Sequence, residues 1–131
     1  MNYQRNIFVV DDSKIIADIM KKVISSVTGI KVTDFRNSES FLTAMDNKIP
    51  DMIFLDYYLD AENKKEVTGE EIFHRVKKEH PEIPIVLLTG IGDPEKLEHF
   101  RKIGFMDVIN KHEPEIFNHI INCVKNIAVE D

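Results

Sequence analysis

Two short segments of this chain are apolar at every position, and both end on aspartate. Residues 7–10 (IFVV) run into Asp11 and Asp12, and residues 52–55 (MIFL) run into Asp56. A strand that is apolar throughout is typical of a parallel sheet covered by helices on both faces. Ligands of such sheets bind beyond the carboxyl ends of the strands. The sequence therefore predicts a covered parallel sheet with three carboxylates at one edge.

Three carboxylates at one edge have a chemical consequence. Like charges held together repel, and each raises the pKa of its neighbours. A chain that keeps Asp11, Asp12 and Asp56 together is expected to hold a cation there or to use one of the carboxylates in a reaction.

Short apolar runs alternate with helical patterns along the whole chain. We expect five strands, at residues 6–11, 30–35, 51–56, 83–89 and 105–110. We expect five helices, at residues 14–28, from a cap at Ser38 to Met45, from a capping box at Thr68 to His80, from Asp93 to Gly104, and at 114–128. Five repeats of strand then helix predict an α/β layered domain with right-handed crossovers.

Composition narrows the classes of partner. The chain has 131 residues, which fits a single domain, and a formal net charge of -6, which argues against direct binding of nucleic acid. No apolar stretch approaches the ~20 residues that span a bilayer, so no membrane association is expected. The single cysteine, Cys123, excludes an intrachain disulfide and argues against a cysteine-based metal site, and the five histidines show no metal-like clustering.

Polar residues end four of the expected strands in a fixed order. They are Asp11-Asp12, Asp56, Thr89-Gly90 and Lys111. In this order the sequence resembles the receiver domain of bacterial response regulators, of the chemotaxis-regulator type used in two-component signalling, over essentially its whole length. The resemblance implies a doubly wound, flavodoxin-like (βα)5 fold with strand order 2-1-3-4-5. It also implies a cytoplasmic protein in which residues 1–131 form one receiver domain, with no output domain in this chain.

The resemblance assigns a role to each of these residues. It implies that Mg2+ is bound by Asp12 and Asp56 through their side chains, by Asp11 mostly through water, and by Tyr58 through its backbone carbonyl. Asp56 is then the phosphoacceptor, and it takes a phosphoryl group from a phosphohistidine on a histidine kinase or phosphotransfer protein. Lys111 would neutralise charge on the phosphoryl oxygens, and Thr89 would donate a hydrogen bond to one of them.

The same resemblance implies a signalling protein that catalyses only its own phosphorylation and dephosphorylation. Its expected partners are the donor and either a downstream target protein or an output domain.

Three features depart from the family pattern. Gly69 follows Asp56 by thirteen residues, where the family usually has about eight, and this indicates a surface-loop insertion at 60–67. Val108 stands in the place of the family's switch aromatic, and valine is small and stiff at χ1. His112 follows Lys111 where the family usually has a proline with a cis bond. We predict a trans bond there, because a non-proline cis bond costs about 3 kcal/mol.

Other interpretations stay open. Taken singly, the aspartates read as helix caps or turn residues, and Lys111 reads as a solvated lysine. Val108 and His112 favour an alternative function, a phosphorylation-independent interaction module that binds through its fourth helix, fifth strand and fifth helix. A third class is a small phosphatase with an aspartyl nucleophile, but the Asp-x-Asp pattern of those enzymes is absent after the first apolar run.

Overall fold

The structure is a computed structural model that describes residues 5–59 and 67–128. Its main sheet has five parallel strands in the order β2-β1-β3-β6-β7. They are β1 (Asn6–Val10), β2 (Lys31–Phe35), β3 (Met52–Asp56), β6 (Ile85–Thr89) and β7 (Asp107–Asn110). Counted over these five strands, the order is 2-1-3-4-5, so the predicted topology is confirmed.

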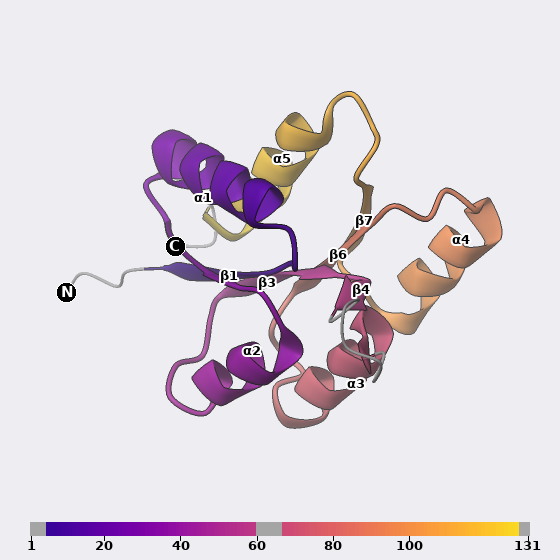
Figure 1. The fold of residues 1–131 in the computed structure, drawn as a ribbon, viewed down its shortest axis with the longest axis horizontal. Coiled ribbons are helices and arrows are strands. Elements are labelled where there is room, and N and C mark those ends of the chain that lie inside the picture. The colour runs from indigo at the N-terminus through magenta and orange to yellow at the C-terminus, as the bar shows by residue number, and fades with distance from the viewer. Residues whose placement is uncertain (1–4, 60–66, 129–131) are drawn as a thin grey trace.

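Helices cover both faces of this sheet (Figure 1). α1 (Lys14–Thr28) and α5 (Ile116–Ala128) pack on one face. α2 (Ser38–Met45), α3 (Gly69–Glu79) and α4 (Pro94–Ile103) pack on the other. Each face has its own apolar cluster, with Val9 and Ile109 in the first and Val10 and Val108 in the second. Alternate side chains of one strand therefore enter different layers, which explains why β1, β3 and β6 are buried at every position.

A second, two-stranded antiparallel sheet follows β3 and was not predicted. β4 (Tyr58–Leu59) pairs with β5 (Val67–Thr68). This ladder brackets the segment that was expected to be a surface insertion, of which residues 60–66 lie outside the described residues. The ladder returns the chain to the carboxyl edge of the sheet directly before α3.

Helix ends largely follow the capping residues in the sequence. Thr68 caps α3 by accepting a hydrogen bond from Glu71 N, and Asp93 caps α4 by accepting one from Glu95 N, as predicted. The prediction that Ser38 caps α2 is wrong. Asn37 is the cap: its backbone is extended and its Oδ1 accepts from Ser40 N at 2.8 Å. Asn and Ser are equally good caps, so two adjacent candidates could not be separated by sequence.

Other differences from the predictions are small. Four strands begin later than expected, at Lys31, Met52, Ile85 and Asp107, and the last helix begins at Ile116. Ile19 and Val27 of α1 are apolar but 37% and 57% exposed.

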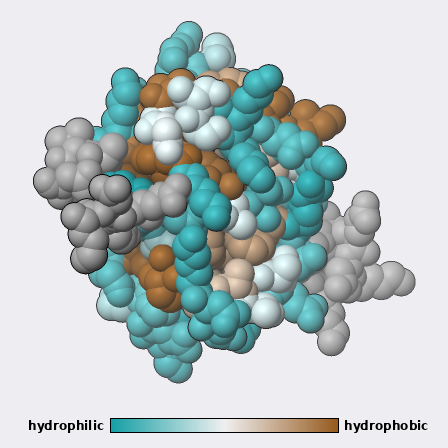
Figure 2. Space-filling view, turned by 90° about the vertical axis from the view of Figure 1, so that its left-hand side faces the viewer, coloured by the Kyte–Doolittle hydropathy of each residue, from teal (hydrophilic) through white to brown (hydrophobic). Residues whose placement is uncertain are grey.

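The exposed apolar side chains are scattered. Figure 2 shows them on one face of the molecule as separate brown patches between hydrophilic side chains. Within the described residues, none of the helices combines the length and the apolar character that a bilayer crossing needs.

Candidate functional site

The three predicted aspartates meet at the carboxyl edge of the sheet. β1 and β3 are neighbours in register, so Asp11 and Asp56 follow adjacent strand ends. Asp11, Asp12 and Asp56 each place a carboxylate oxygen within 4.8 Å of the others. Asp11 and Asp56 are buried, whereas Asp12 is exposed. We call these three residues the acidic pocket.

Asp12 is not the N-cap of α1, which removes one ordinary interpretation of its place. Ser13 holds that position, and its hydroxyl accepts a hydrogen bond from Ile16 N at 3.3 Å. Asp11 instead organises the turn between β1 and α1, because its Oδ1 accepts from Ser13 N at 2.9 Å. The exposed carboxylate of Asp12 is thus left available for a ligand at the mouth of the pocket.

Lys111 supplies the positive charge of the site. Its Nζ lies 2.9 Å from Asp11 Oδ2 and 3.0 Å from Asp56 Oδ1. Its backbone is fixed to the neighbouring strand, since Lys111 N donates to Thr89 O at 2.8 Å. The described residues contain no cis peptide bond, so the predicted trans bond between Lys111 and His112 is confirmed.

The crowding of charge changes proton affinities in the pocket. Burial and the neighbouring Asp11 carboxylate raise the pKa of Asp56 to about 7, although Lys111 opposes the rise. Burial lowers the pKa of Lys111, but the charges of Asp56 and Asp11 and their hydrogen bonds outweigh burial and leave that pKa above its ordinary value. One partly buried ammonium is therefore shared by two buried carboxylates, with a third carboxylate nearby.

Thr89 occupies the end of the next strand. The register pairs Asp56 with Leu88, which places Thr89 one position beyond the level of Asp56. The threonine is fully buried, and its Oγ1 accepts a hydrogen bond from Ile91 N at 3.0 Å. In this conformation the hydroxyl holds its own loop, so any movement of Thr89 is transmitted directly to Ile91.

Gly69 is a site residue whose role is not evident from its place in the sequence. Its N–H donates to Tyr57 O at 2.6 Å, which seats the start of α3 against the chain that follows Asp56. A Cβ at Gly69 would lie 2.7 Å from Asp56 O and 3.0 Å from Tyr57 Cα. The close approach requires glycine, and the thirteen-residue separation from Asp56 hid the signal.

The donor set of the acidic pocket fits a hard divalent cation. Mg2+ prefers carboxylate oxygens and water, and it is usually held by one or two carboxylates. Asp11 Oδ2 is buried, and the Lys111 ammonium faces it at 2.9 Å as its counter-ion. Tyr58 begins β4 two residues after Asp56, and the role of its carbonyl as a metal ligand stays a prediction.

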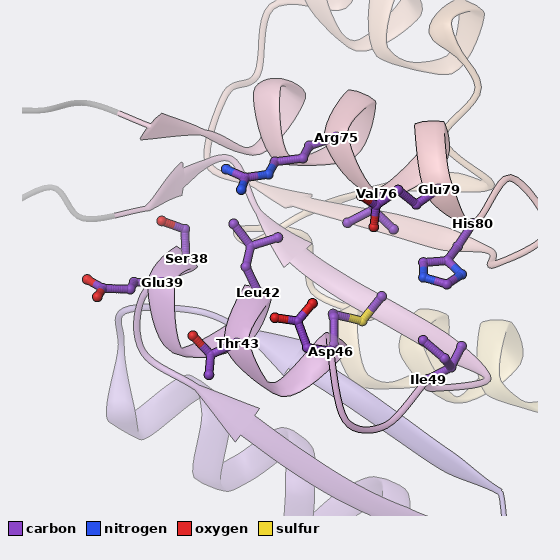
Figure 3. A pocket seen from close by; sticks show the side chains of 11 residues that line it. Ser38, Glu39, Leu42, Thr43, Asp46, Ile49, Arg75, Val76, Glu79 and His80 are labelled. Carbon is purple, nitrogen blue, oxygen red and sulfur yellow. The ribbon is translucent and has the colours of Figure 1, made fainter.

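A groove elsewhere on the molecule takes no part in this pocket. It has a volume of about 610 Å³ and runs between α2 and α3 (Figure 3). Its lining includes the acidic residues Glu39, Asp46 and Glu79 and the basic residue Arg75. None of its lining residues belongs to the acidic pocket. The chemistry of the site therefore resides in the strand-end cluster and not in this groove.

Comparisons with known proteins point the same way as the geometry. The chain is 29% identical over 106 residues to the nitrogen assimilation regulatory protein NtrX of Azorhizobium caulinodans. The aligned residues cover 81% of this chain and 22% of that protein. It is 26% identical over 103 residues to the luminescence regulatory protein LuxO of Vibrio campbellii, covering 79% of this chain and 21% of that one. The chain thus spans about a fifth of the length of these curated relatives.

Solved structures agree on the fold. The receiver domain of NtrX from Brucella abortus superimposes with a TM-score of 0.81 at 26% identity, covering 95% of this chain and 99% of that one. The BeF3-activated receiver domain of DrrB also gives a TM-score of 0.81, at 25% identity, covering 98% and 100%. The sequence matches the family described as the response regulator receiver domain over residues 7–121. This chain belongs to that family of two-component signalling domains.

Proposed function

We propose that the protein is a phosphoacceptor receiver domain that takes a phosphoryl group on Asp56 and signals through the resulting change of conformation. The observation that carries the proposal is the ion-paired position of Asp56. Its carboxylate lies at a strand end, 3.0 Å from Lys111 and within 4.8 Å of two more carboxylates. This arrangement supplies a nucleophile, a fixed positive charge and a cation site in one place.

The reaction follows from these side chains. An oxygen of Asp56 attacks phosphorus, the bond between phosphorus and the donor's imidazole nitrogen breaks, and the electron pair leaves with the imidazole, which takes up a proton. Phosphoryl transfer depends mainly on positioning and on neutralising charge. Lys111 would stay paired with the negative charge as it moves from the carboxylate to the phosphoryl oxygens, and Thr89 would exchange its local contact for one of those oxygens.

A cation has a defined part in this scheme. With its pKa at about 7, Asp56 would be partly protonated near neutral pH, and a protonated carboxyl is a poor nucleophile. When bound, Mg2+ would favour the ionised carboxylate and neutralise the incoming phosphoryl oxygens. We assign its ligands to Asp12 and Asp56 through their side chains, to Asp11 through water, and to the backbone carbonyl of Tyr58.

The proposed donor is a phosphohistidine on a histidine kinase or phosphotransfer protein. The proposed recipient of the signal is a downstream protein or an output domain. The relatives support this: NtrX and LuxO are named as regulatory proteins, and this chain aligns with about a fifth of each.

The test is a mass measurement on the intact chain. Incubation with acetyl phosphate and Mg2+ should add one phosphoryl group, and Asp56→Asn should abolish the addition. Asp46→Asn, the same change at an exposed aspartate after α2 and outside the acidic pocket, serves as the matched control and should be phosphorylated like the wild type. Failure of the wild type to gain mass with acetyl phosphate and with a phosphohistidine donor would contradict the proposal.

A second function has one observation in its favour. Val108 is buried in the cluster under α3 and α4, in the place of the family's switch aromatic, and cannot report phosphorylation by a ring swing. A phosphorylation-independent interaction module would need no such swing. Partner binding that is equal for the wild type and Asp56→Asn, with and without acetyl phosphate, would favour this alternative.

A further inference from the structure

A second cluster of ionisable side chains joins β7 to α5, away from the acidic pocket. Asp107 begins β7, and His119 and Cys123 are four residues apart on α5, so they share one face of that helix. Their nitrogen, sulfur and oxygen atoms lie within 4.8 Å of one another. α5 lies beside β7 in Figure 1. The proximity of these residues is set by the packing of helix on strand.

Two donors converge on one oxygen in this cluster. Asp107 Oδ2 lies 2.7 Å from His119 Nε2 and 3.6 Å from the Cys123 thiol, which donates to it. The other ring nitrogen, His119 Nδ1, lies 2.7 Å from Glu113 Oε1. Both ring nitrogens face carboxylates. Burial lowers the pKa of His119, but these hydrogen bonds and charges outweigh burial, raise that pKa and so favour protons on both nitrogens. One of those protons, on Nε2, occupies the position where a cation would sit.

We propose that Asp107, His119 and Cys123 form a binding site for zinc, with Glu113 orienting the histidine. Imidazole and thiolate ligands select zinc and similar transition metals over Mg2+. A histidine that binds a metal almost always donates its second ring N–H to a carboxylate, a backbone carbonyl or water, and Glu113 stands in that position. Three protein ligands leave a fourth tetrahedral position for water or a partner's side chain.

The geometry needs only a small adjustment to admit the ion. Tetrahedral zinc, with bonds of about 2.0–2.3 Å, spaces its ligand atoms at roughly 3.3–3.8 Å. The Cys123 and Asp107 atoms already lie within this range, and the His119 and Asp107 atoms at 2.7 Å must part by about 0.6 Å once their shared proton leaves. The side chains of His119 and Asp107 are 29% and 33% exposed, which gives the ion a path from solvent to the buried sulfur.

Binding has a fixed proton balance. Zn2+ replaces the proton on His119 Nε2 and the proton on the Cys123 sulfur, so two protons leave for each ion bound. Burial, together with Asp107, raises the pKa of the Cys123 thiol to about 12. Zinc affinity should therefore rise steeply with pH, because the ion competes with protons for both ligands.

Co2+ is the spectroscopic probe for the test. The reduced protein is titrated with Co2+ in excess Mg2+, which fills the acidic pocket. We expect a thiolate-to-cobalt charge-transfer band in the near ultraviolet and visible tetrahedral bands, both saturating at one equivalent and removed by Zn2+. Cys123→Ser should lose the near-ultraviolet band. Glu113→Gln should keep it and weaken Co2+ binding by about 10- to 100-fold.

Matched variants separate this site from other metal binding. His74→Gln alters an exposed histidine of α3, and Asp12→Asn alters the acidic pocket; both should bind Co2+ like the wild type. No charge-transfer band in the wild type, unchanged affinity in His119→Gln, or loss of binding in Asp12→Asn would each overturn the proposal. If Cys123→Ser melts early, His119→Gln and Glu113→Gln decide the question, because these side chains are partly exposed and their replacement leaves the core intact.

Discussion

At Asp56, protonation and folding are linked. The pKa of its carboxyl rises from 3.8 to about 7 on folding, so between these values the folded chain binds more protons than the unfolded chain. Without metal, the free energy of unfolding should fall as the pH rises from about 4 to about 7 and then level off. Asp56→Asn should remove this slope and be more stable than the wild type above pH 7, by about 1–4 kcal/mol. Urea melts of both proteins in the presence of a chelator, at a series of pH values, measure these free energies of unfolding.

Gly69 offers a second residue-scale prediction. Gly69→Ala should destabilise the fold by about 1–3 kcal/mol, because the new Cβ meets the backbone of Asp56 and Tyr57, which cannot yield as a side chain tip can. Gly92→Ala is the matched control: its Cβ would meet only Asn110 Nδ2 at 4.0 Å, and its stability should change by less than about 0.5 kcal/mol. Equal effects of the two changes in urea melts would be evidence against close packing at Gly69.

On the scale of elements, the loop between β6 and α4 is the part best placed to move. Thr89 Oγ1 accepts from Ile91 N, so a hydroxyl that turns toward a phosphoryl group must release that amide. Tyr57, the residue after Asp56, contacts Phe100 of α4 with ring centroids 5.2 Å apart. Both connections lead from the region of Asp56 to α4 without passing through Val108.

This route predicts how two variants should differ. In amide-shift mapping with beryllofluoride and Mg2+, Thr89→Ala should lose the shifts at residues 90–96, whereas Val108→Ala should keep them, since a ligand moves an equilibrium only through its differential contacts. Val108 is buried, so a thermal melt must first show that Val108→Ala is folded. Shifts that vanish in Val108→Ala and persist in Thr89→Ala would reverse the assignment.

For the molecule as a whole, the acidic pocket predicts a response to metal. Mg2+ should bind without any phosphoryl donor, because the single ammonium of Lys111 cannot neutralise three carboxylates. The ion should raise the melting temperature of the wild type and narrow its difference from Asp56→Asn, because it binds the folded state alone. Calorimetry on the wild type and Asp12→Ala checks this, and equal heats would remove Asp12 from the ligand set.

Features that follow from regular strand patterns could be predicted from the sequence, whereas very short strands and a contact between a helix and a strand could not. The covered parallel sheet and the meeting of Asp11, Asp12 and Asp56 were predictable, because strands buried on both faces leave an unbroken apolar run and parallel strands share one carboxyl edge. The strand order was predicted from the family resemblance. The β4–β5 ladder was missed because strands of two residues are too short to show a period. The Asp107, His119 and Cys123 cluster was missed because its members meet only when α5 docks on β7.

The short ladder has a consequence for how this domain can vary. Tyr58 pairs with Thr68, and Gly69 N donates a hydrogen bond to Tyr57 O. These contacts hold the two ends of the intervening segment together next to Asp56. We therefore expect a peptide tag or a fluorescent domain grafted between those ends to leave the position of the Asp56 carboxylate unchanged.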